Sequence, residues 1–330
     1  MQPFLISLGD PAGIGPEVTA RAWEARQSAG LPPFVAVGDA ASVQAVWDGP
    51  IAVVDSLSAG AAAFADAFPI WHVEDSGPLQ PGVPTSAGAH CALQSLELGV
   101  GLARAGDAVG LITAPICKDQ LYQVGFTQAG QTEFIADRCG VSRCNAVMML
   151  AGPGLRVVPI TVHVPMRDVP ALLTTELIVA KTLATARGMA KNFGIERPRL
   201  AIAGFNPHAG ENGALGREEI DIIAPAVARL RSEGIDISGP HSPDALFTPD
   251  ARASYDAALC MYHDQALIPL KALYFDEGVN LTLGLPIVRT SPDHGTAFDI
   301  AGTGQACPGP MIAAIRMAGE MAATRAQCEA

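Results

Sequence analysis

The sequence has few aromatic and charged residues. Aromatic side chains make up 5% of the 330 residues and charged side chains 16%, the latter below the roughly 25% of an average soluble domain. So few aromatics argue against the stacking platforms that bind single-stranded nucleic acid. The formal net charge is −12 at pH 7, and a field of that sign repels phosphate backbones and anionic membranes. We therefore expect neither nucleic acid nor a membrane as a partner.

The sequence also lacks long apolar runs and paired cysteine motifs. No stretch approaches the ~20 apolar residues that a membrane span needs. The apolar segment 4–8 has no basic flank and leads into a glycine loop, so it predicts a first strand and not a signal peptide. The seven cysteines are scattered without a CxxC pair, which indicates reduced thiols. These features predict a cytoplasmic protein.

Short apolar runs alternate along the chain with helical stretches rich in alanine and leucine. The predicted strands are 4–8, 34–37, 109–113, 145–150, 156–162, 200–203 and 257–262. The predicted helices are 17–27, 87–104, 169–191, 220–233 and 311–321. This repeated order predicts an α/β fold with largely parallel sheets. A chain of 330 residues also exceeds what one core usually organises, so we expect two domains.

Three histidines follow three apolar runs, and ligands in open α/β sheets bind beyond the carboxyl ends of strands. His163 follows the run 156–162, His208 lies in the loop after 200–203, and His263 follows 257–262. Three imidazoles would hold a divalent metal and leave a position open for substrate. A histidine at the end of a strand is equally explained as a structural, hydrogen-bonded residue, so spacing alone leaves both interpretations open. Asp244 and Asp264 are available as further ligand, orienting group or proton acceptor.

A glycine-rich loop, Gly9-Asp-Pro-Ala-Gly-Ile-Gly-Pro-Glu17, follows the first predicted strand. Pro16 and Glu17 suit the first turn of a helix. The loop is not a GxGxxG motif, so it does not support a Rossmann site, and a tight turn would explain its glycines equally well.

Four motifs together carry a family resemblance. They are the glycine loop, Asn206-Pro-His-Ala-Gly-Glu211, Met261-Tyr-His-Asp-Gln265, and the segment from Gly284-Leu-Pro through Arg289-Thr-Ser-Pro-Asp-His294-Gly-Thr. The chain thereby resembles the 4-hydroxythreonine-4-phosphate dehydrogenase family of pyridoxal phosphate biosynthesis, from residue 9 to about residue 304. The resemblance implies two α/β/α domains like those of isocitrate and isopropylmalate dehydrogenases, with the active site in the interdomain cleft. It implies a dinucleotide-binding domain over 1–125 and 255–330, and a metal, substrate and dimerisation domain over 126–254.

The resemblance also implies roles for individual residues. The metal ligands, for Zn, Mg or Co, are His163, His208 and His263. The substrate-binding residues are Gln131, Thr132, Lys271, Asn280 and Arg289, in which lysine and arginine supply local positive charge. The NAD or NADP contacts are Gly13, Gly15, His294, Gly295 and Asp299. The proton acceptor stays open between Asp244, Asp264 and a relayed water. The family's active site lies at the interface of a homodimer.

The implied reaction is the metal-dependent oxidation of 4-phosphohydroxy-L-threonine by NAD(P). Its product, 2-amino-3-oxo-4-phosphooxybutanoate, loses CO2 to give 3-amino-2-oxopropyl phosphate. One position departs from the family pattern, because Gln131 stands where the family usually has histidine. That change leaves a related phosphorylated sugar acid, 4-phospho-erythronate or 4-phospho-threonate, as an alternative substrate. Acyl transfer to phosphate and non-catalytic binding of a phosphometabolite are further alternatives.

Overall fold

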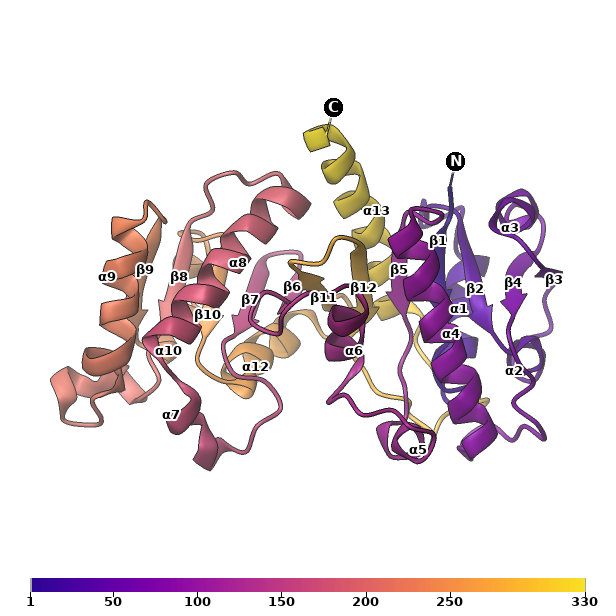
Figure 1. Ribbon diagram of the computed structural model, residues 1–330, viewed down its shortest axis with the longest axis horizontal. Coiled ribbons are helices and arrows are strands. Elements are labelled where there is room, and N and C mark those ends of the chain that lie inside the picture. Colours follow the sequence, from indigo (N-terminus) through magenta and orange to yellow (C-terminus); the bar gives the residue numbers. More distant parts are fainter. Residues whose placement is uncertain (1, 330) are drawn as a thin grey trace. The chain divides into compact units, whose positions relative to one another are not determined.

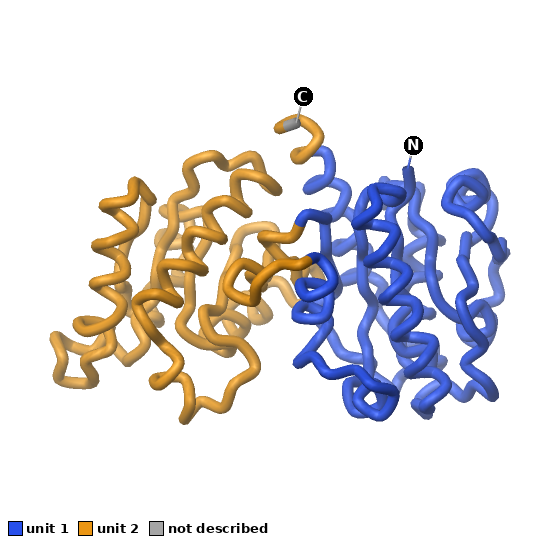
Figure 2. Tube along the Cα trace, in the orientation of Figure 1, with its two compact units in different colours: residues 1–139, 286–323 blue, residues 140–285, 324–330 orange. Residues whose placement is uncertain are grey.

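The computed structural model describes residues 2–329, which form two compact units. Unit 1 contains residues 1–139 and 286–323, and unit 2 contains 140–285 and 324–330 (Figure 2). Strands alternate with helices in both units (Figure 1). The predicted α/β class with largely parallel sheets is confirmed.

Six parallel strands form the sheet of unit 1, in the order β3-β4-β2-β1-β5-β12. The strands are β1 (Phe4–Ser7), β2 (Phe34–Gly38), β3 (Ile51–Val54), β4 (Phe68–His72), β5 (Gly110–Thr113) and β12 (Val288–Pro292). The helices are α1 (Gly15–Glu24), α2 (Ala40–Gln44), α3 (Leu57–Ala63), α4 (Ser86–Ala105), α5 (Lys118–Gln123), α6 (Gln131–Arg138) and most of α13 (Gly309–Glu329). β1, β2 and β5 are buried along their whole length, which makes this sheet the core of the unit.

The sheet of unit 2 is mixed, in the order β11-β6-β7-β10-β8-β9. β6 runs antiparallel to both its neighbours, and the pairs β7–β10, β10–β8 and β8–β9 are parallel. The strands are β6 (Val147–Gly152), β7 (Leu155–Pro159), β8 (Leu200–Ala203), β9 (Ile237–His241), β10 (Ala257–Cys260) and β11 (Val279–Leu283). The helical segments are η1 (Met166–Asp168), α7 (Val169–Leu172), α8 (Thr175–Phe193), η2 (Pro207–Gly213), η3 (Glu219–Ile223), α9 (Ala224–Ser232), α10 (Pro243–Leu246), α11 (Pro249–Arg252) and α12 (His263–Tyr274).

The long helices α4 and α8 begin at threonine caps and end at glycines. The Thr85 hydroxyl accepts from the Gly88 amide at the start of α4, and Gly106 at its end takes a left-handed φ of 80°.

The single helix predicted over 169–191 is wrong, because α7 and α8 are separate. Leu173 and Thr174 are extended between them, and Thr174 caps α8 by accepting from the Leu177 amide.

The unit boundaries differ from those expected at 125 and 255. β10 and α12 lie in unit 2 because β10 pairs with β7 and β8, and α12 packs on β7 and β10. His163, His208 and His263 therefore all lie in unit 2.

Within residues 2–329, no single helix has the length and hydropathy needed to cross a bilayer. The bent pair Met166–Leu172 and Thr175–Phe193, which meet at 91°, reaches that length and composition only together.

Candidate active site

His163 and His263 lie side by side in unit 2, with ring centroids 5.5 Å apart. The predicted strands 156–162 and 257–262 end earlier than expected, at Pro159 and Cys260. Hydrogen bonds nevertheless continue past both ends, from the Ile160 amide to Cys260 O (2.7 Å) and from the Thr161 hydroxyl to Met261 O (2.8 Å). This extended pairing of the two segments brings the two histidines together.

The ring of His263 is oriented by its neighbour Asp264. The His263 Nδ1 lies 2.7 Å from Asp264 Oδ1, and because an ionised carboxylate only accepts, Nδ1 carries the proton. That tautomer leaves Nε2 as a lone-pair donor, the usual arrangement of a metal-binding histidine. A pocket of about 180 Å³ beside the two rings is lined by Thr161, His163, Val164, Met166, Val169, Tyr262, His263 and Asp264.

His208 lies on a left-handed turn after β8. Its φ is 52°, and Ala209, Glu211 and Asn212 also have φ between 45° and 54°. For residues with a β-carbon this conformation costs about 1–2 kcal/mol each. Strain of this kind gathers at functional sites, where surrounding contacts hold it in place. His163, with φ 54°, shares the same unusual conformation.

The buried carboxylate of Glu219 holds this turn. Its Oε1 accepts from the Phe205 and Asn206 amides, each at 2.7 Å, and its Oε2 accepts from Asn206 Nδ2 at 3.0 Å. Glu219 is 3% exposed and opens the π-helical turn η3. Sequence reasoning missed this residue, because it stands in the charged stretch Arg217-Glu-Glu-Ile-Asp221, where nothing distinguishes it from its acidic neighbours.

The side chain of His208 faces solvent and Glu211, whose Oε2 lies 3.1 Å from His208 Nδ1. His208 is not among the residues that line the pocket beside His163. Among residues 2–329, the group of three whose ligand atoms lie within 4.8 Å of one another is Asp39, His72 and Asp75, not the three predicted histidines. The structure thus brings together two of these histidines and places the third on its own turn.

Asp244 lies near His208, at the start of α10. A hydrogen bond from the Ser242 hydroxyl lowers the pKa of Asp244, and the charge of His208 adds to the effect. The carboxylate is therefore ionised at neutral pH. Lys271, on α12, and Asn280, on β11, are both half-buried, and neither lines the pocket beside His163.

Unit 1 contains a buried arginine, Arg289, on β12. It is 3% exposed, and its guanidinium donates to the Thr113 hydroxyl at 2.8 Å and to the Thr132 hydroxyl at 3.4 Å. Burial lowers the pKa of Arg289 to about 10, against the opposing charge of Glu133. Thr132 and Arg289, far apart in sequence, therefore lie together in one group of polar side chains, which we call the polar wall.

Gln131 and Glu133 belong to the same wall. Gln131 Nε2 donates to the Ala114 carbonyl at 3.0 Å, which fixes the amide with Oε1 on the other side. Within residues 2–329, Gln131 Oε1 and Glu133 Oε2 are buried without a hydrogen-bond partner. Lys118, not predicted from sequence, places Nζ 3.7 Å from the position that a β-carbon on Gly130 would take. The wall therefore offers acceptors as well as cations.

The residues predicted to bind the dinucleotide also lie in unit 1. The Ile14 amide donates to Thr296 O at 3.0 Å, which joins the glycine loop to the segment after His294. A β-carbon on Gly15 would lie 2.2 Å from Leu8 O, so packing alone explains that glycine. Gly295 has open space where a β-carbon would be, and Asp299 is exposed. His294 Nδ1 is bonded to Gly295 O at 3.0 Å.

Comparison with known proteins decides the family. The model of "Pyridoxal phosphate biosynthetic protein PdxA" matches residues 31–318. The chain belongs to the PdxA family. It is 56% identical over 330 residues to the 4-hydroxythreonine-4-phosphate dehydrogenase of Erythrobacter litoralis, covering 98% of each chain. It is 53% identical to that of Zymomonas mobilis, covering 98% of this chain and 97% of the other.

A solved member of the PdxA family has the same fold. The crystal structure of the 4-hydroxythreonine-4-phosphate dehydrogenase from Klebsiella pneumoniae is 35% identical and superposes with a TM-score of 0.84, over 97% of this chain and 98% of that one. The resemblance inferred from four motifs is therefore confirmed, and with it the family fold.

Proposed function

We propose that the protein is a 4-hydroxythreonine-4-phosphate dehydrogenase of pyridoxal phosphate biosynthesis. Its substrate is 4-phosphohydroxy-L-threonine, oxidised at C3 with NAD or NADP. The 2-amino-3-oxo-4-phosphooxybutanoate product then loses CO2 to give 3-amino-2-oxopropyl phosphate. The observation that carries the proposal is the pair His163 and His263, held beside a pocket with Asp264 orienting one ring. The family membership supports it.

The donor set fits a divalent cation such as Zn, Co or Mg. Nδ1 of both His263 and His208 lies against a carboxylate oxygen, which directs each Nε2 outward as a ligand. His163, His208 and His263 would hold the ion once His208 turns from Glu211. A bound ion supplies Lewis acidity to the substrate hydroxyl, and a bound nicotinamide dinucleotide accepts hydride.

Residues of the chain itself would orient the histidine, accept the proton and bind the substrate and the dinucleotide. Asp264 positions His263, while Asp244, kept ionised by Ser242, accepts the hydroxyl proton. In unit 1, Arg289 and Thr132 bind the phosphate, because a guanidinium and a hydroxyl both donate to its oxygens. Lys271 and Asn280 bind other polar groups of the substrate. Gly13, Gly15, His294, Gly295 and Asp299 contact the dinucleotide.

A homodimer completes the proposal. Three large apolar side chains on or just after α12 are exposed: Ile268, Leu273 and Phe275, of which Phe275 is 72% exposed. Such side chains suit an interface between two copies of the chain. All seven cysteines are free thiols, which fits the cytoplasm.

Gln131, in place of the histidine usual in the family, is compatible with a second candidate, a 4-phospho-erythronate or 4-phospho-threonate dehydrogenase. The amide donor of Gln131 is bound to Ala114 O, and the atom on the other side is an acceptor. All three candidate substrates carry the same phosphate and differ at C2, which bears an ammonium in the amino acid and a hydroxyl in the sugar acids. The Gln131 oxygen can accept from either of these groups but not from a dianionic phosphate.

The deciding experiment measures NADH formation from 4-phosphohydroxy-L-threonine and from the two sugar-acid phosphates, with and without a chelator. We expect turnover of the amino acid phosphate that a chelator abolishes and added metal restores. No NADH and no NADPH from any of the three, with metal-loaded protein supplied with NAD or NADP, would refute the dehydrogenase proposal. Faster turnover of a sugar-acid phosphate would establish the second candidate.

A further inference from the structure

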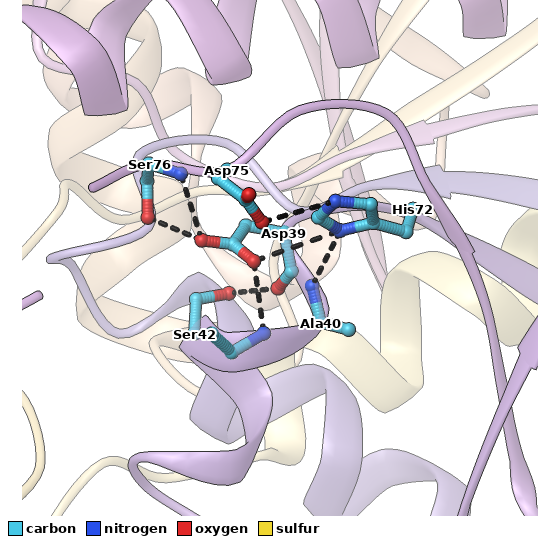
Figure 3. A network of polar contacts seen from close by, with 7 residues as sticks. Asp39, Ala40, Ser42, His72, Asp75 and Ser76 are labelled. Atoms are coloured by element: carbon cyan, nitrogen blue, oxygen red, sulfur yellow. Dashed lines mark hydrogen bonds and ion pairs between the residues drawn. The ribbon is translucent and has the colours of Figure 1, made fainter. Parts of the chain in front are cut away.

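A second set of metal-ligating side chains lies in unit 1, outside the residues assigned above. β2 and β4 are parallel neighbours that end together, with Gly38 opposite His72 in the register. Asp39 directly follows β2, and His72 is the last residue of β4. Asp75 follows three residues later, and the three side chains converge (Figure 3). The carboxyl ends of parallel strands are where ligands bind in such sheets.

Asp39 is the fixed member of this set. It is 2% exposed, its Oδ1 accepts from the Ala41 amide at 2.9 Å, and its Oδ2 accepts from the Ser76 amide at 2.9 Å. The Ser76 hydroxyl also donates to Oδ2. A carboxylate has about four lone-pair positions, so these bonds orient Asp39 and still leave Oδ1 able to bind a cation.

His72 lies between the two carboxylates. Its Nδ1 accepts from the Ala40 amide at 3.3 Å and lies 3.6 Å from Asp39 Oδ1, and its Nε2 is 3.3 Å from Asp75 Oδ1. An ion bound at Nδ1 would take the place of the long hydrogen bond from Ala40. One ligand atom from each of the three residues lies within 4.8 Å of the other two. Ligands about 2.0–2.2 Å from a tetrahedral ion are roughly 3.4 Å apart. The side chain of Asp75 is 89% exposed, so it can rotate by the small amount that closes such a site.

The surrounding charges are negative. The thiol of Cys91, on α4, has a backbone contact with Asp39 and is acted on by the charges of Asp39, Glu74 and Asp10. A buried carboxylate in such a field is stabilised by a cation placed next to it.

We propose that Asp39, His72 and Asp75 form a second divalent-cation site, distinct from the histidines of unit 2. One imidazole nitrogen with carboxylate oxygens suits Zn, Co or Mn. The ion ties the segment after β4 to the ends of β2 and β4, because Asp75 and Ser76 lie in that segment and Asp39 and His72 do not. Its role is structural, since none of its residues is assigned to substrate or dinucleotide.

The test uses the full chain with His163→Ala and His263→Ala, which removes the pair in unit 2. Equilibrium dialysis against CoCl2 alone, with the visible spectrum of Co²⁺ as second readout, is expected to give one equivalent bound and a rise in Tm. Adding His72→Ala is expected to abolish both. Adding His90→Ala, an exposed histidine on α4, is expected to change neither.

Asp75→Asn provides a second variant, because its exposed side chain is not needed for folding; we expect Co²⁺ affinity to fall at least tenfold. In the otherwise unchanged protein, His72→Ala is expected to leave turnover unaltered. Co²⁺ binding that survives both His72→Ala and Asp75→Asn, or no Co²⁺ binding by the folded double variant, would overturn the site. Both readouts are independent of dehydrogenase activity.

Discussion

The polar wall around Arg289 and the histidine segments of unit 2 are built in opposite ways. Arg289 lies within a buried strand and is held by two threonine hydroxyls. His163 and His208 lie on turns beyond strand ends, in left-handed conformations, with exposed side chains. A buried cation is held in place before any ligand arrives, whereas an exposed imidazole can turn towards one. In the proposed function, anion binding would depend on burial, and metal binding would depend on how the turns are held.

The largest effect is expected from His263→Ala. Loss of a ligand with an oriented Nε2 removes the ion and the stabilisation of several kcal/mol that it supplies, so kcat/KM should fall roughly 100- to 10,000-fold. Metal content by mass spectrometry and steady-state rates would be measured together. His90→Ala is the matched control, and full metal content in His263→Ala would show that this histidine is not a ligand.

Arg289→Lys tests the polar wall around Arg289 in unit 1. Lysine keeps the charge but loses the planar donors that reach Thr113 and Thr132, so KM should rise about 10- to 100-fold, with less change in kcat. Arg138→Lys, in an exposed pair with Glu97, is the control and should change neither constant. An unchanged KM in Arg289→Lys would remove Arg289 from phosphate binding.

The lowered pKa of Arg289 should make phosphate binding at the polar wall depend on pH. Because burial brings this pKa down to about 10, the guanidinium loses its proton above that pH while exposed arginines keep theirs. Affinity for a phosphate should therefore fall as pH rises through 10. KM measured from pH 8 to 11, with circular dichroism to check the fold, would show the rise; a flat KM would contradict it.

Glu219→Gln tests how the turn of His208 is held. A neutral amide replaces a carboxylate that accepts from two amides and a side chain, so unfolding free energy should fall by about 1–3 kcal/mol. Urea unfolding measures this, and metal affinity should fall with it. Glu233→Gln, in an exposed pair with Arg229, should cost less than about 1 kcal/mol. Equal costs in the two variants would show that Glu219 does not hold the turn.

The smallest effect is expected from Gln131→His. A histidine adds a donor where Gln131 has an acceptor oxygen, so we expect a few-fold lower KM for 4-phosphohydroxy-L-threonine below pH 6.5, where imidazole is charged. The ratio of KM values for the amino acid and sugar-acid phosphates is the measurement. An unchanged ratio would mean that position 131 does not select the substrate.

Much of the fold could be predicted from the sequence because apolar runs mark buried parallel strands. The strand predicted over 200–203 is β8 to the residue, and 34–37 differs from β2 by one. Five strands were not predicted: β3, β4, β9, β11 and β12. β3 and β9 are only partly buried at the edges of their sheets, whereas β12 is buried but has the sequence VRTSP, so its apolar pattern is weak. The break between α7 and α8 was missed because Thr174 acts through a cap, which hydrophobic periodicity does not reveal.

The candidate site was less predictable than the fold. His163 and His263 could be paired because both follow neighbouring strands, and Thr132 and Arg289 came from the family motifs. Glu219 and Lys118 carry no local signal, since their importance arises from contacts with residues distant in the sequence. The orientation of Gln131 depends on the carbonyl of Ala114, which no sequence pattern shows.

The left-handed turn after β8 also bears on thermal stability. Ala209 has a β-carbon and no side-chain function, yet its φ is 52°. Glycine adopts this conformation without steric penalty, so Ala209→Gly offers a route to a more heat-resistant enzyme that leaves His208 and Glu219 untouched. A chain that retains alanine here can gain stability at an exposed turn, without any change to its buried core.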